Sequence, residues 1–224
     1  MDRLHRIRLL IGEKAVSKLN QSTVMVVGCG AVGSFAIEAL ARSGIGHLIL
    51  IDFDVVEESN INRQLFAMDS SIGQPKVDVA KQRIFDINKN IKVDTFNMFF
   101  DENTNIDIKT DFVIDAIDSV QSKIALYKWC FDNNVDFISS MGAARKTDMN
   151  KIRIDKLSRT TMCPLAAKIR KIVRDNGMPD FSVVYSVENA TPQTNGGREF
   201  GSVITVTGCF GLMMADFAIK KLSI

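Results

Sequence analysis

Three glycines with a characteristic spacing follow a short apolar segment near the start of the chain. Gly28, Gly30 and Gly33 form a Gly-x-Gly-x-x-Gly pattern directly after Val24–Val27 and before a stretch with helical spacing. In this context the first glycine permits a tight turn, the second lets the backbone approach a phosphate, and the third allows close helix–strand packing. The unpaired N–H groups at the start of the helix attract an anion. The pattern therefore predicts a nucleotide-binding loop.

Charged side chains beyond this loop indicate which type of nucleotide it binds. Asp52 ends the second predicted strand, 19 residues after Gly33, where a carboxylate can bind ribose hydroxyls. A nicotinamide dehydrogenase needs only that acid, whereas a triphosphate also needs cations such as Arg63, which can bind bidentately, and Lys76. Asp118 follows another predicted strand and suits Mg²⁺, held by one carboxylate and phosphate oxygens. This order of residues favours a nucleoside triphosphate with magnesium.

The elements that must position these residues alternate along the first part of the chain. Helical spacing begins at Val32 and ends before Gly44, and further helices are predicted at 75–87 and 121–131. Between the helices lie apolar strands, predicted at 24–27, 47–51, 91–96, 112–117 and 137–141. This alternation predicts an α/β fold, Rossmann-like and doubly wound, with a mostly parallel sheet over about the first 142 residues.

The pattern changes beyond Gly142. The later elements are expected to be an alternating segment at 152–157, a helix at 164–173, a strand at 181–187, a loop at 189–201 and a helix at 203–221. Without a linker or an internal repeat, we interpret residues 1–224 as one domain. In this interpretation residues 1–142 bind the nucleotide, and residues 143–224 are a C-terminal elaboration of the same sheet that binds the substrate.

The composition of the whole chain excludes several classes of protein. With 28 Lys+Arg, 26 Asp+Glu and 46% hydrophobic residues, the chain is neither a disordered acidic tail nor a uniformly basic coat protein. Its four cysteines form no Cys-x-x-Cys pair, which argues against a zinc ribbon and fits reduced thiols in the cytoplasm. The N-terminus lacks the apolar segment of a secretory signal, and the apolar stretch 203–215 is too short for a membrane span.

Positive charge is concentrated in one segment. Residues 144–174 contain ten basic residues against two aspartates, a net charge of +8, so the other 193 residues carry −6. Such one-sided charge favours contact with a phosphate backbone over an ordinary solvated surface. The segment has no aromatic residues, so recognition of bases must come from elsewhere. The candidate contacts to nucleic acid are Arg145, Lys151, Arg153, Arg159, Lys168, Arg170, Lys171 and Arg174.

Five motifs in a fixed order identify a family resemblance. They are Gly-x-Gly-x-x-Gly-Ser at 28–34, Asp-x-Asp at 52–54, Ser-Asn-x-x-Arg-Gln at 59–64, Gln-Pro-Lys at 74–76 and Asp-x-x-Asp at 115–118. In this order they resemble the ubiquitin-activating-enzyme-like (ThiF-type) adenylating superfamily. Within it, the chain looks like the tRNA threonylcarbamoyladenosine dehydratases of the CsdL type. Further segments that support this branch lie at 10–15, 38–46, 113–120, 164–170 and 192–196.

The resemblance implies a role for each matching residue. Arg63, Lys76 and Asp118 would act on the phosphates of ATP, with Asp118 binding the magnesium. Members of the family are homodimers in which an N-terminal arginine reaches the partner's ATP site; Arg6 aligns best with it and Arg8 second. The residues implied to contact the nucleotide are Gly28, Gly30, Gly33, Asp52, Asp54, Asn60, Arg63, Gln64 and Lys76.

The resemblance also implies a reaction. The threonyl carboxylate of the modified adenosine would be adenylated by ATP with release of pyrophosphate, and the carbamoyl nitrogen would then close a cyclic hydantoin and release AMP. Three alternatives stay open: adenylation of the C-terminal glycine of a ubiquitin-like sulfur-carrier protein, a non-catalytic tRNA-binding module, and, as the weakest, a nicotinamide dehydrogenase. The resemblance leaves open whether a monovalent cation assists, whether a sulfur-transfer protein docks, and whether Cys163 is a nucleophile or a packing residue.

Overall fold

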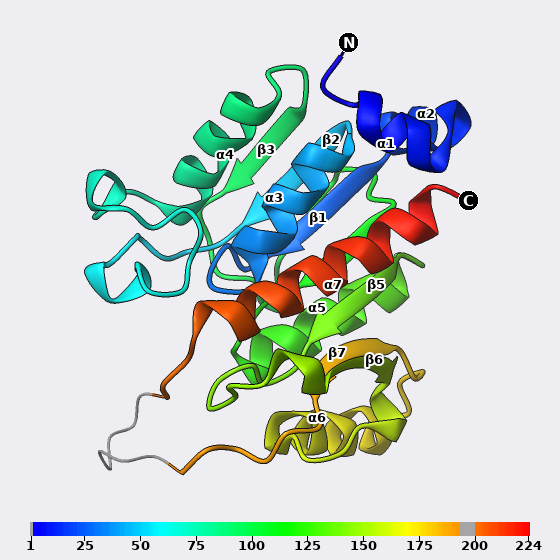
Figure 1. Cartoon of the computed structure of the whole chain (residues 1–224). Coiled ribbons are helices and arrows are strands. Elements are labelled where there is room, and N and C mark those ends of the chain that lie inside the picture. Colours follow the sequence, from blue (N-terminus) through cyan, green and yellow to red (C-terminus); the bar gives the residue numbers. More distant parts are fainter. Residues whose placement is uncertain (1, 193–199) are drawn as a thin grey trace.

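One seven-stranded sheet runs through the protein (Figure 1). In the computed structural model, which describes residues 2–192 and 200–224, the strand order is β3-β2-β1-β4-β5-β7-β6. Only β6, at one edge, runs antiparallel to its neighbour. The strands are β1 (Thr23–Val27), β2 (His47–Ile51), β3 (Lys92–Phe96), β4 (Phe112–Asp115), β5 (Asp136–Ser140), β6 (Ile152–Lys156) and β7 (Ser182–Ser186).

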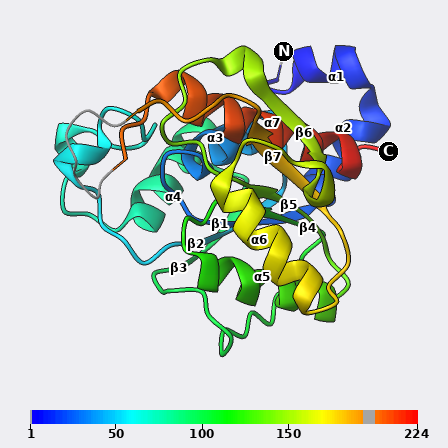
Figure 2. The same ribbon diagram turned by 90° about the horizontal axis from the view of Figure 1, so that it is seen from below.

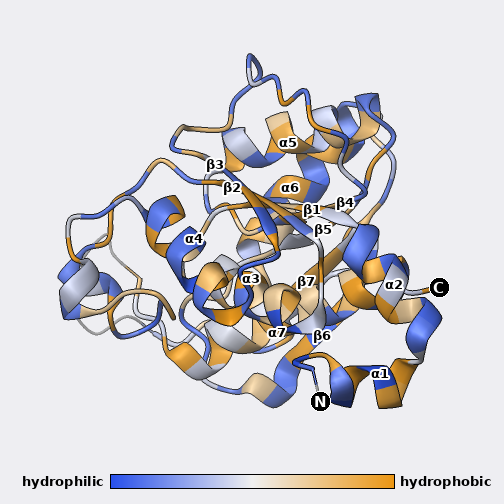
Figure 3. Ribbon diagram, turned by 90° about the horizontal axis from the view of Figure 1, so that it is seen from above, coloured by the Kyte–Doolittle hydropathy of each residue, from blue (hydrophilic) through white to orange (hydrophobic). Residues whose placement is uncertain are grey.

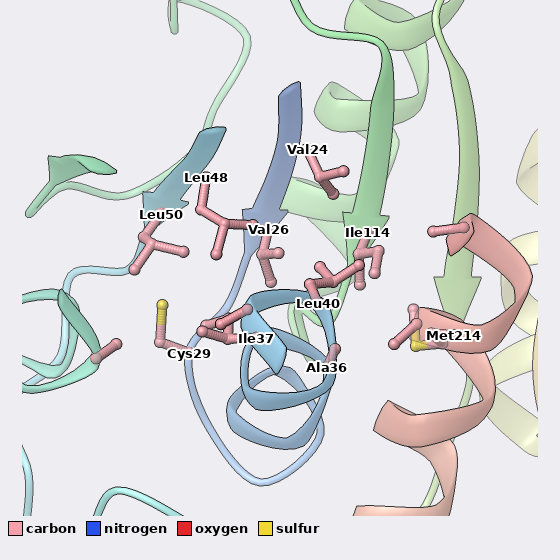
Figure 4. Close-up of a cluster of buried hydrophobic side chains, with 14 of the residues drawn as sticks. Val24, Val26, Cys29, Ala36, Ile37, Leu40, Leu48, Leu50, Ile114 and Met214 are labelled. Atoms are coloured by element: carbon pink, nitrogen blue, oxygen red, sulfur yellow. The ribbon is translucent and has the colours of Figure 1, made fainter. Parts of the chain in front are cut away.

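Continuous apolar sequence explains the central strands, because both faces of a parallel sheet are covered. Val24 pairs with Leu48 on one side and with Phe112 on the other. Alternate residues point to opposite faces, so Val24, Val26 and Leu50 enter one core while Met25, Val27 and Ile49 enter a second. Figure 4 shows the first core, where strand residues meet side chains of two helices, among them Ala36, Ile37, Leu40 and Met214.

Helices cover both faces of the sheet (Figure 2). On one face lie α3 (Gly33–Ser43), α4 (Lys76–Ile87) and α7 (Ile204–Leu222), and on the other lie α5 (Val120–Asp132) and α6 (Pro164–Asp175). Helix α7 buries Val206, Phe210 and Met214 at a spacing of four residues against α3 and the sheet. It is therefore the core helix that the sequence predicts. Among the described residues, none of the helices has the length and apolar character needed to cross a membrane.

Two short helices at the N-terminus were not predicted. Helix α1 (His5–Ile11) buries none of its residues, whereas α2 (Glu13–Gln21) buries Val16 and Leu19. Helix α2 is joined to the loop after α3, because the Gly46 N–H donates to the Leu19 carbonyl. Figure 3 shows the apolar strands lying between helices whose outer faces are largely hydrophilic. Short 3₁₀ turns complete the structure at Glu58–Asn60, Asp69–Ser71, Met149–Lys151 and Leu157–Arg159.

The predicted fold class is confirmed. The predicted strands and helices all form, and β6 and β7 extend the same sheet rather than forming a separate unit. The one clear boundary error is β4, which ends at Asp115 because the Asp115 side chain turns back to accept the Ile117 N–H at 3.1 Å. Much of the predicted loop 189–201, with most of the Pro-Gln-x-x-Gly motif, lies outside the described residues.

Two glycines of α7 provide a test of the α3–α7 contact. A Cβ on Gly211 would lie 2.2 Å from the Val32 carbonyl oxygen, whereas one on Gly208 would meet only the Phe35 ring, at 3.0 Å. We expect Gly211→Ala to lower the free energy of unfolding by about 1–3 kcal/mol, because a backbone atom must move. Gly208→Ala carries the same gain in helix propensity and should cost less, because the ring can shift. Urea denaturation compares them; equal stability of the two variants would contradict this packing.

Candidate active site

The candidate site lies at the carboxyl edge of the sheet, between β1 and β4. The loop after β1 leads to α3 on one face, while the loop after β4 leads to α5 on the opposite face. Where neighbouring parallel strands send their connections to opposite faces, a crevice opens that binds ligands in doubly wound folds. Most of the residues singled out in the sequence meet at this crevice.

The three glycines of the loop differ in whether a larger residue would fit at their positions. Gly28 has a φ of 94°, and a Cβ there would lie 2.6 Å from the Ala116 carbonyl oxygen. A Cβ on Gly33 would lie 1.7 Å from the Gly28 carbonyl oxygen. Gly30 is different, because the nearest atom to a Cβ there is Nε2 of Gln64, at 3.7 Å. Protein packing thus requires Gly28 and Gly33, whereas Gly30 borders space that a ligand can approach.

Asp52 is fixed at the end of β2 by the backbone around it. Its Oδ2 accepts the Cys29 N–H at 2.6 Å, and its Oδ1 accepts the Asp54 N–H at 2.9 Å. Burial raises the pKa of the Asp52 carboxyl, and the two backbone donors oppose this shift. Each oxygen retains a lone pair, so the carboxylate can accept further hydrogen bonds from a pair of hydroxyls.

Lys76 begins α4 and points its ammonium group at Asp54. The two atoms, Nζ and Oδ2, lie 2.6 Å apart, and the Lys76 side chain is 9% exposed. The Lys76 N–H also donates to the Asp54 carbonyl at 3.0 Å, and Val55 bridges to Pro75, so both segments are held together. Asp54 therefore contacts Lys76 and orients its charge at the edge of the site.

A short helical turn places three polar side chains beside the glycine loop. The Asn60 side chain accepts the Glu57 N–H, and the Asn60 carbonyl accepts the N–H groups of Arg63 and Gln64. Gln64 is buried against Gly30. Among the residues that the structure describes, the guanidinium of Arg63 donates only to oxygens without charge, the Ser59 carbonyl at 2.7 Å and the Asn62 side chain. Its positive charge is thus available to an anionic ligand.

Asp118 lies exposed in the turn between β4 and α5. Within the described ranges, 2–192 and 200–224, its carboxylate has no ion pair or hydrogen bond. Those same residues contain no group of three acidic, histidine or cysteine side chains that could hold a metal ion. A single free carboxylate fits the way Mg²⁺ binds to nucleotides, where phosphate oxygens and water supply the other ligands. Asp118 would be the protein ligand of such an ion.

Arg6 does not join these residues. It lies exposed on α1, which sits with α2 at the amino edge of the sheet, opposite the glycine loop (Figure 1). Arg8, the second candidate, is paired with Asp2 at 2.8 Å and with Glu13 at 2.5 Å. Arg6 therefore cannot reach the crevice of its own chain.

The basic segment 144–174 divides into surface charges and structural ones. The Arg170 guanidinium donates to the Thr160 carbonyl at 2.8 Å and to the Thr160 hydroxyl at 2.6 Å. Arg145 Nε donates to the Thr191 carbonyl at 2.8 Å. Lys168, Lys171 and Arg174 share the outer side of α6, and together with other exposed residues they make up the basic surface: Lys151, Arg153, Lys156, Arg159, Lys168, Lys171 and Arg174.

None of the four cysteines, all of which the structure describes, is fully exposed to solvent. All four are free thiols, and Cys29 and Cys130 are buried in the two cores, where burial raises their pKa values. Cys163 is buried as well; its Sγ caps α6 and accepts the Ala166 N–H at 3.5 Å. This environment indicates a packing role for Cys163.

Sequence reasoning missed one polar pair next to the site. Lys123 and Asp115 are both fully buried, with Nζ and Oδ2 2.7 Å apart. Asp115 is the first residue of the Asp-x-x-Asp motif, and a lysine in the first turn of the following helix is the signal that could have indicated the pair.

Known proteins match both the sequence and the structure. The model of the ThiF family matches residues 2–224. The tRNA threonylcarbamoyladenosine dehydratase of Bacillus subtilis is 45% identical over 188 residues, which cover 82% of this chain and 74% of the relative. The E. coli tRNA N6-threonylcarbamoyladenosine dehydratase, solved in complex with ATP, is 35% identical with a TM-score of 0.91, covering 98% of this chain and 93% of that chain. A molybdopterin-synthase adenylyltransferase of Haemophilus influenzae is 38% identical over 129 residues, covering 57% of this chain and 52% of the relative.

The contrast between the glycines gives a prediction for the site. Gly30→Ala should leave the melting temperature unchanged, because no protein atom obstructs the new methyl group, and should weaken ATP binding about tenfold or more by blocking the close approach of a phosphate. Gly33→Ala should lower the melting temperature, because its Cβ meets backbone. Thermal melting and calorimetric titration with ATP measure both effects. Full ATP affinity in folded Gly30→Ala would show that the nucleotide does not contact this loop.

Proposed function

The chain belongs to the ThiF family, and on this basis we propose that it is an ATP-dependent tRNA threonylcarbamoyladenosine dehydratase. One observation carries the proposal: a relative of that name is 45% identical over 82% of the chain. The carboxyl-edge site supports it, because it joins a ribose-binding acid, a phosphate loop and the cations Arg63 and Lys76 in one crevice. The molybdopterin-synthase adenylyltransferases match little more than half of the chain.

Each site residue has a role in holding ATP. Asp52 accepts the ribose hydroxyls, and the glycine loop with the start of α3 faces the phosphates. Arg63 and Lys76, with Asn60 and Gln64 beside them, neutralise the β- and γ-phosphates, which leave together as pyrophosphate. Asp118 would hold magnesium, which supplies further positive charge to the phosphate oxygens when bound.

The reaction proceeds in two displacements. A carboxylate oxygen of the threonyl group attacks the α-phosphorus, the bond to the β-phosphate breaks, and pyrophosphate leaves. The carbamoyl nitrogen then attacks the acyl carbon, loses its proton, and expels AMP as the five-membered hydantoin closes. This nucleophile is already tethered to the substrate, so the protein contributes mainly alignment and charge neutralisation.

The basic surface supports contact with tRNA. Lys168, Lys171 and Arg174 project from α6, whose first residue, Pro164, follows the Cys163 cap beside Gly142 at the carboxyl edge of the sheet. A phosphate backbone lying along α6 would thus lead towards the nucleotide site. Arg145 and Arg170 would support this surface through the loops they hold rather than through strong contacts of their own.

A homodimer would bring Arg6 to a site. Because Arg6 lies at the amino edge of its own sheet, it can serve only the crevice of a second chain. Leu9 and Leu10 on the same helix are 71% and 83% exposed and offer apolar surface for contact with that chain. The reduced state of the four thiols suits the cytoplasm as the place of action. Assistance by a monovalent cation and docking of a sulfur-transfer protein are two further hypotheses that come from the family resemblance.

The direct test of this function is release of AMP and pyrophosphate that depends on threonylcarbamoylated tRNA. Lys76→Ala and Asp118→Ala should each lower turnover about 100- to 1000-fold, because each removes one charge partner of the transition state. Lys89→Ala, an exposed lysine beyond the far end of α4, is the matched control and should behave like the wild type. Pyrophosphate exchange that needs a β-grasp carrier protein instead of tRNA would overturn the proposal in favour of sulfur-carrier activation.

The basic surface can be tested by charge reversal on α6. Lys168→Glu/Lys171→Glu should weaken tRNA binding and reduce its dependence on salt concentration, because fewer counterions are released. Its ATP affinity should stay unchanged. Lys89→Glu, which reverses one exposed charge outside the basic surface, serves as the control. Filter binding at several salt concentrations measures the effect, and an unchanged salt slope would place the tRNA elsewhere.

The proposed role of Arg6 predicts complementation between inactive chains. Arg6→Ala and Asp118→Ala should each be inactive, whereas a refolded mixture should recover up to about a quarter of the wild-type activity, because mixed dimers contain one complete site. Asp118→Ala mixed with Lys76→Ala provides the control, since both residues serve the same site and no complete site can form. Recovery in neither mixture would remove Arg6 from the catalytic machinery.

A further inference from the structure

A fully satisfied polar network lies buried directly behind the turn that carries Asp118. The Lys123 ammonium donates to Asp115 Oδ2 at 2.7 Å, to the Ser139 hydroxyl at 3.2 Å and to the Ser140 carbonyl at 2.7 Å. The Ser139 hydroxyl in turn donates to Asp115 Oδ2 at 2.5 Å and is bonded to the Tyr127 hydroxyl. Lys123 thus uses all three of its protons inside the protein.

Stability alone does not account for a buried ion pair of this kind. Lys123, Asp115 and Tyr127 lie among apolar side chains of the second core, and removing two charges from water costs about as much as their attraction returns. Apolar residues of similar size could fill the same space. The network does, however, fix the orientation of one carboxylate, because the Lys123 ammonium and the Ser139 hydroxyl both donate to Asp115 Oδ2.

That carboxylate holds the turn in front of it. Asp115 Oδ2 faces the lysine, while its Oδ1 accepts the Ile117 N–H at 3.1 Å. The residue between them, Ala116, donates its N–H to the Val27 carbonyl and lies against Gly28, where its carbonyl oxygen leaves no room for a Cβ. Asp118 directly follows Ile117. The Asp115–Lys123 pair therefore brackets the whole turn 116–119, from the end of β4 to the first turn of α5.

We propose that Asp115, clamped by Lys123, is a positioning residue that sets the Asp118 carboxylate relative to the glycine loop and so fixes the affinity of the site for magnesium-bound ATP. Asp115 touches neither nucleotide nor metal in this role; it acts through the backbone of residues 116–119. The proposal rests on the proposed function only in assigning Asp118 and the loop to that ligand.

Two double variants separate position from charge. Asp115→Val/Lys123→Met and Asp115→Asn/Lys123→Met both remove the ion pair, but only the asparagine retains an oxygen that can accept the Ile117 N–H. In the valine variant, hydrogen exchange at the amides of 116–119, measured without nucleotide, should accelerate at least about tenfold. The magnesium concentration that gives half of the maximal ATP affinity should rise about 10- to 100-fold. The asparagine variant should lie between the valine variant and the wild type in both measurements, because it keeps an acceptor for the Ile117 N–H but loses the Lys123 bond that orients it.

Two single variants complete the test. Tyr127→Phe removes a buried hydroxyl at the far end of the network, so it should lower stability and leave both readouts unchanged. Ser139→Ala removes a donor to Asp115 without leaving a buried charge, so it should accelerate exchange at 116–119 even if the valine variant does not fold. Wild-type exchange and magnesium dependence in a folded valine variant, or wild-type exchange in Ser139→Ala, would overturn the proposal. Neither readout needs tRNA, so a failure to form the cyclic product would refute the proposed function while leaving this result intact.

Discussion

The structure depends on one close backbone contact, where the loop after β1 meets the turn after β4. Gly28 and Gly33 approach Ala116 and each other so closely that no side chain fits between them. This contact brings the start of α3, which we propose faces the phosphates, next to the turn that carries Asp118. Because α3 and α5 leave on opposite faces of the sheet, the space above the contact stays open to a ligand.

The charged side chains around this crevice divide into those that fix the structure and those that are left for a ligand. Asp52 is held by backbone N–H groups, Asp54 orients Lys76, and Asp115 is bound by Lys123. Arg63, by contrast, has only uncharged partners and Asp118 has none among the described residues. We propose that an anionic nucleotide with a divalent ion completes this set, because it would pair with Arg63 and supply the ligands that a single carboxylate lacks.

The sequence predicted the fold and most of the site because these depend on local patterns. Periodicity located the strands and most helices, and glycine spacing located the loop. It missed α1, a helix of 7 residues that buries none of them and is too short for a helical period to stand out. It could not separate Arg170, bound to Thr160, from Lys171, exposed one residue later, since charge counts do not report tertiary contacts. Lys123 escaped for the same reason: its burial depends on Ser139 and Ser140, which follow it on the next strand.

The proposed reaction depends on activation of the threonyl carboxylate as an acyl-adenylate. Threonylcarbamoylated tRNA whose carboxylate carries a heavy oxygen isotope would reveal this step, by mass spectrometry of the nucleotide released with the hydantoin. We expect one labelled oxygen in the phosphate of AMP, because the oxygen that attacks the α-phosphorus leaves with it when the ring closes. Label found in inorganic phosphate, with ADP as the nucleotide product, would contradict adenylation.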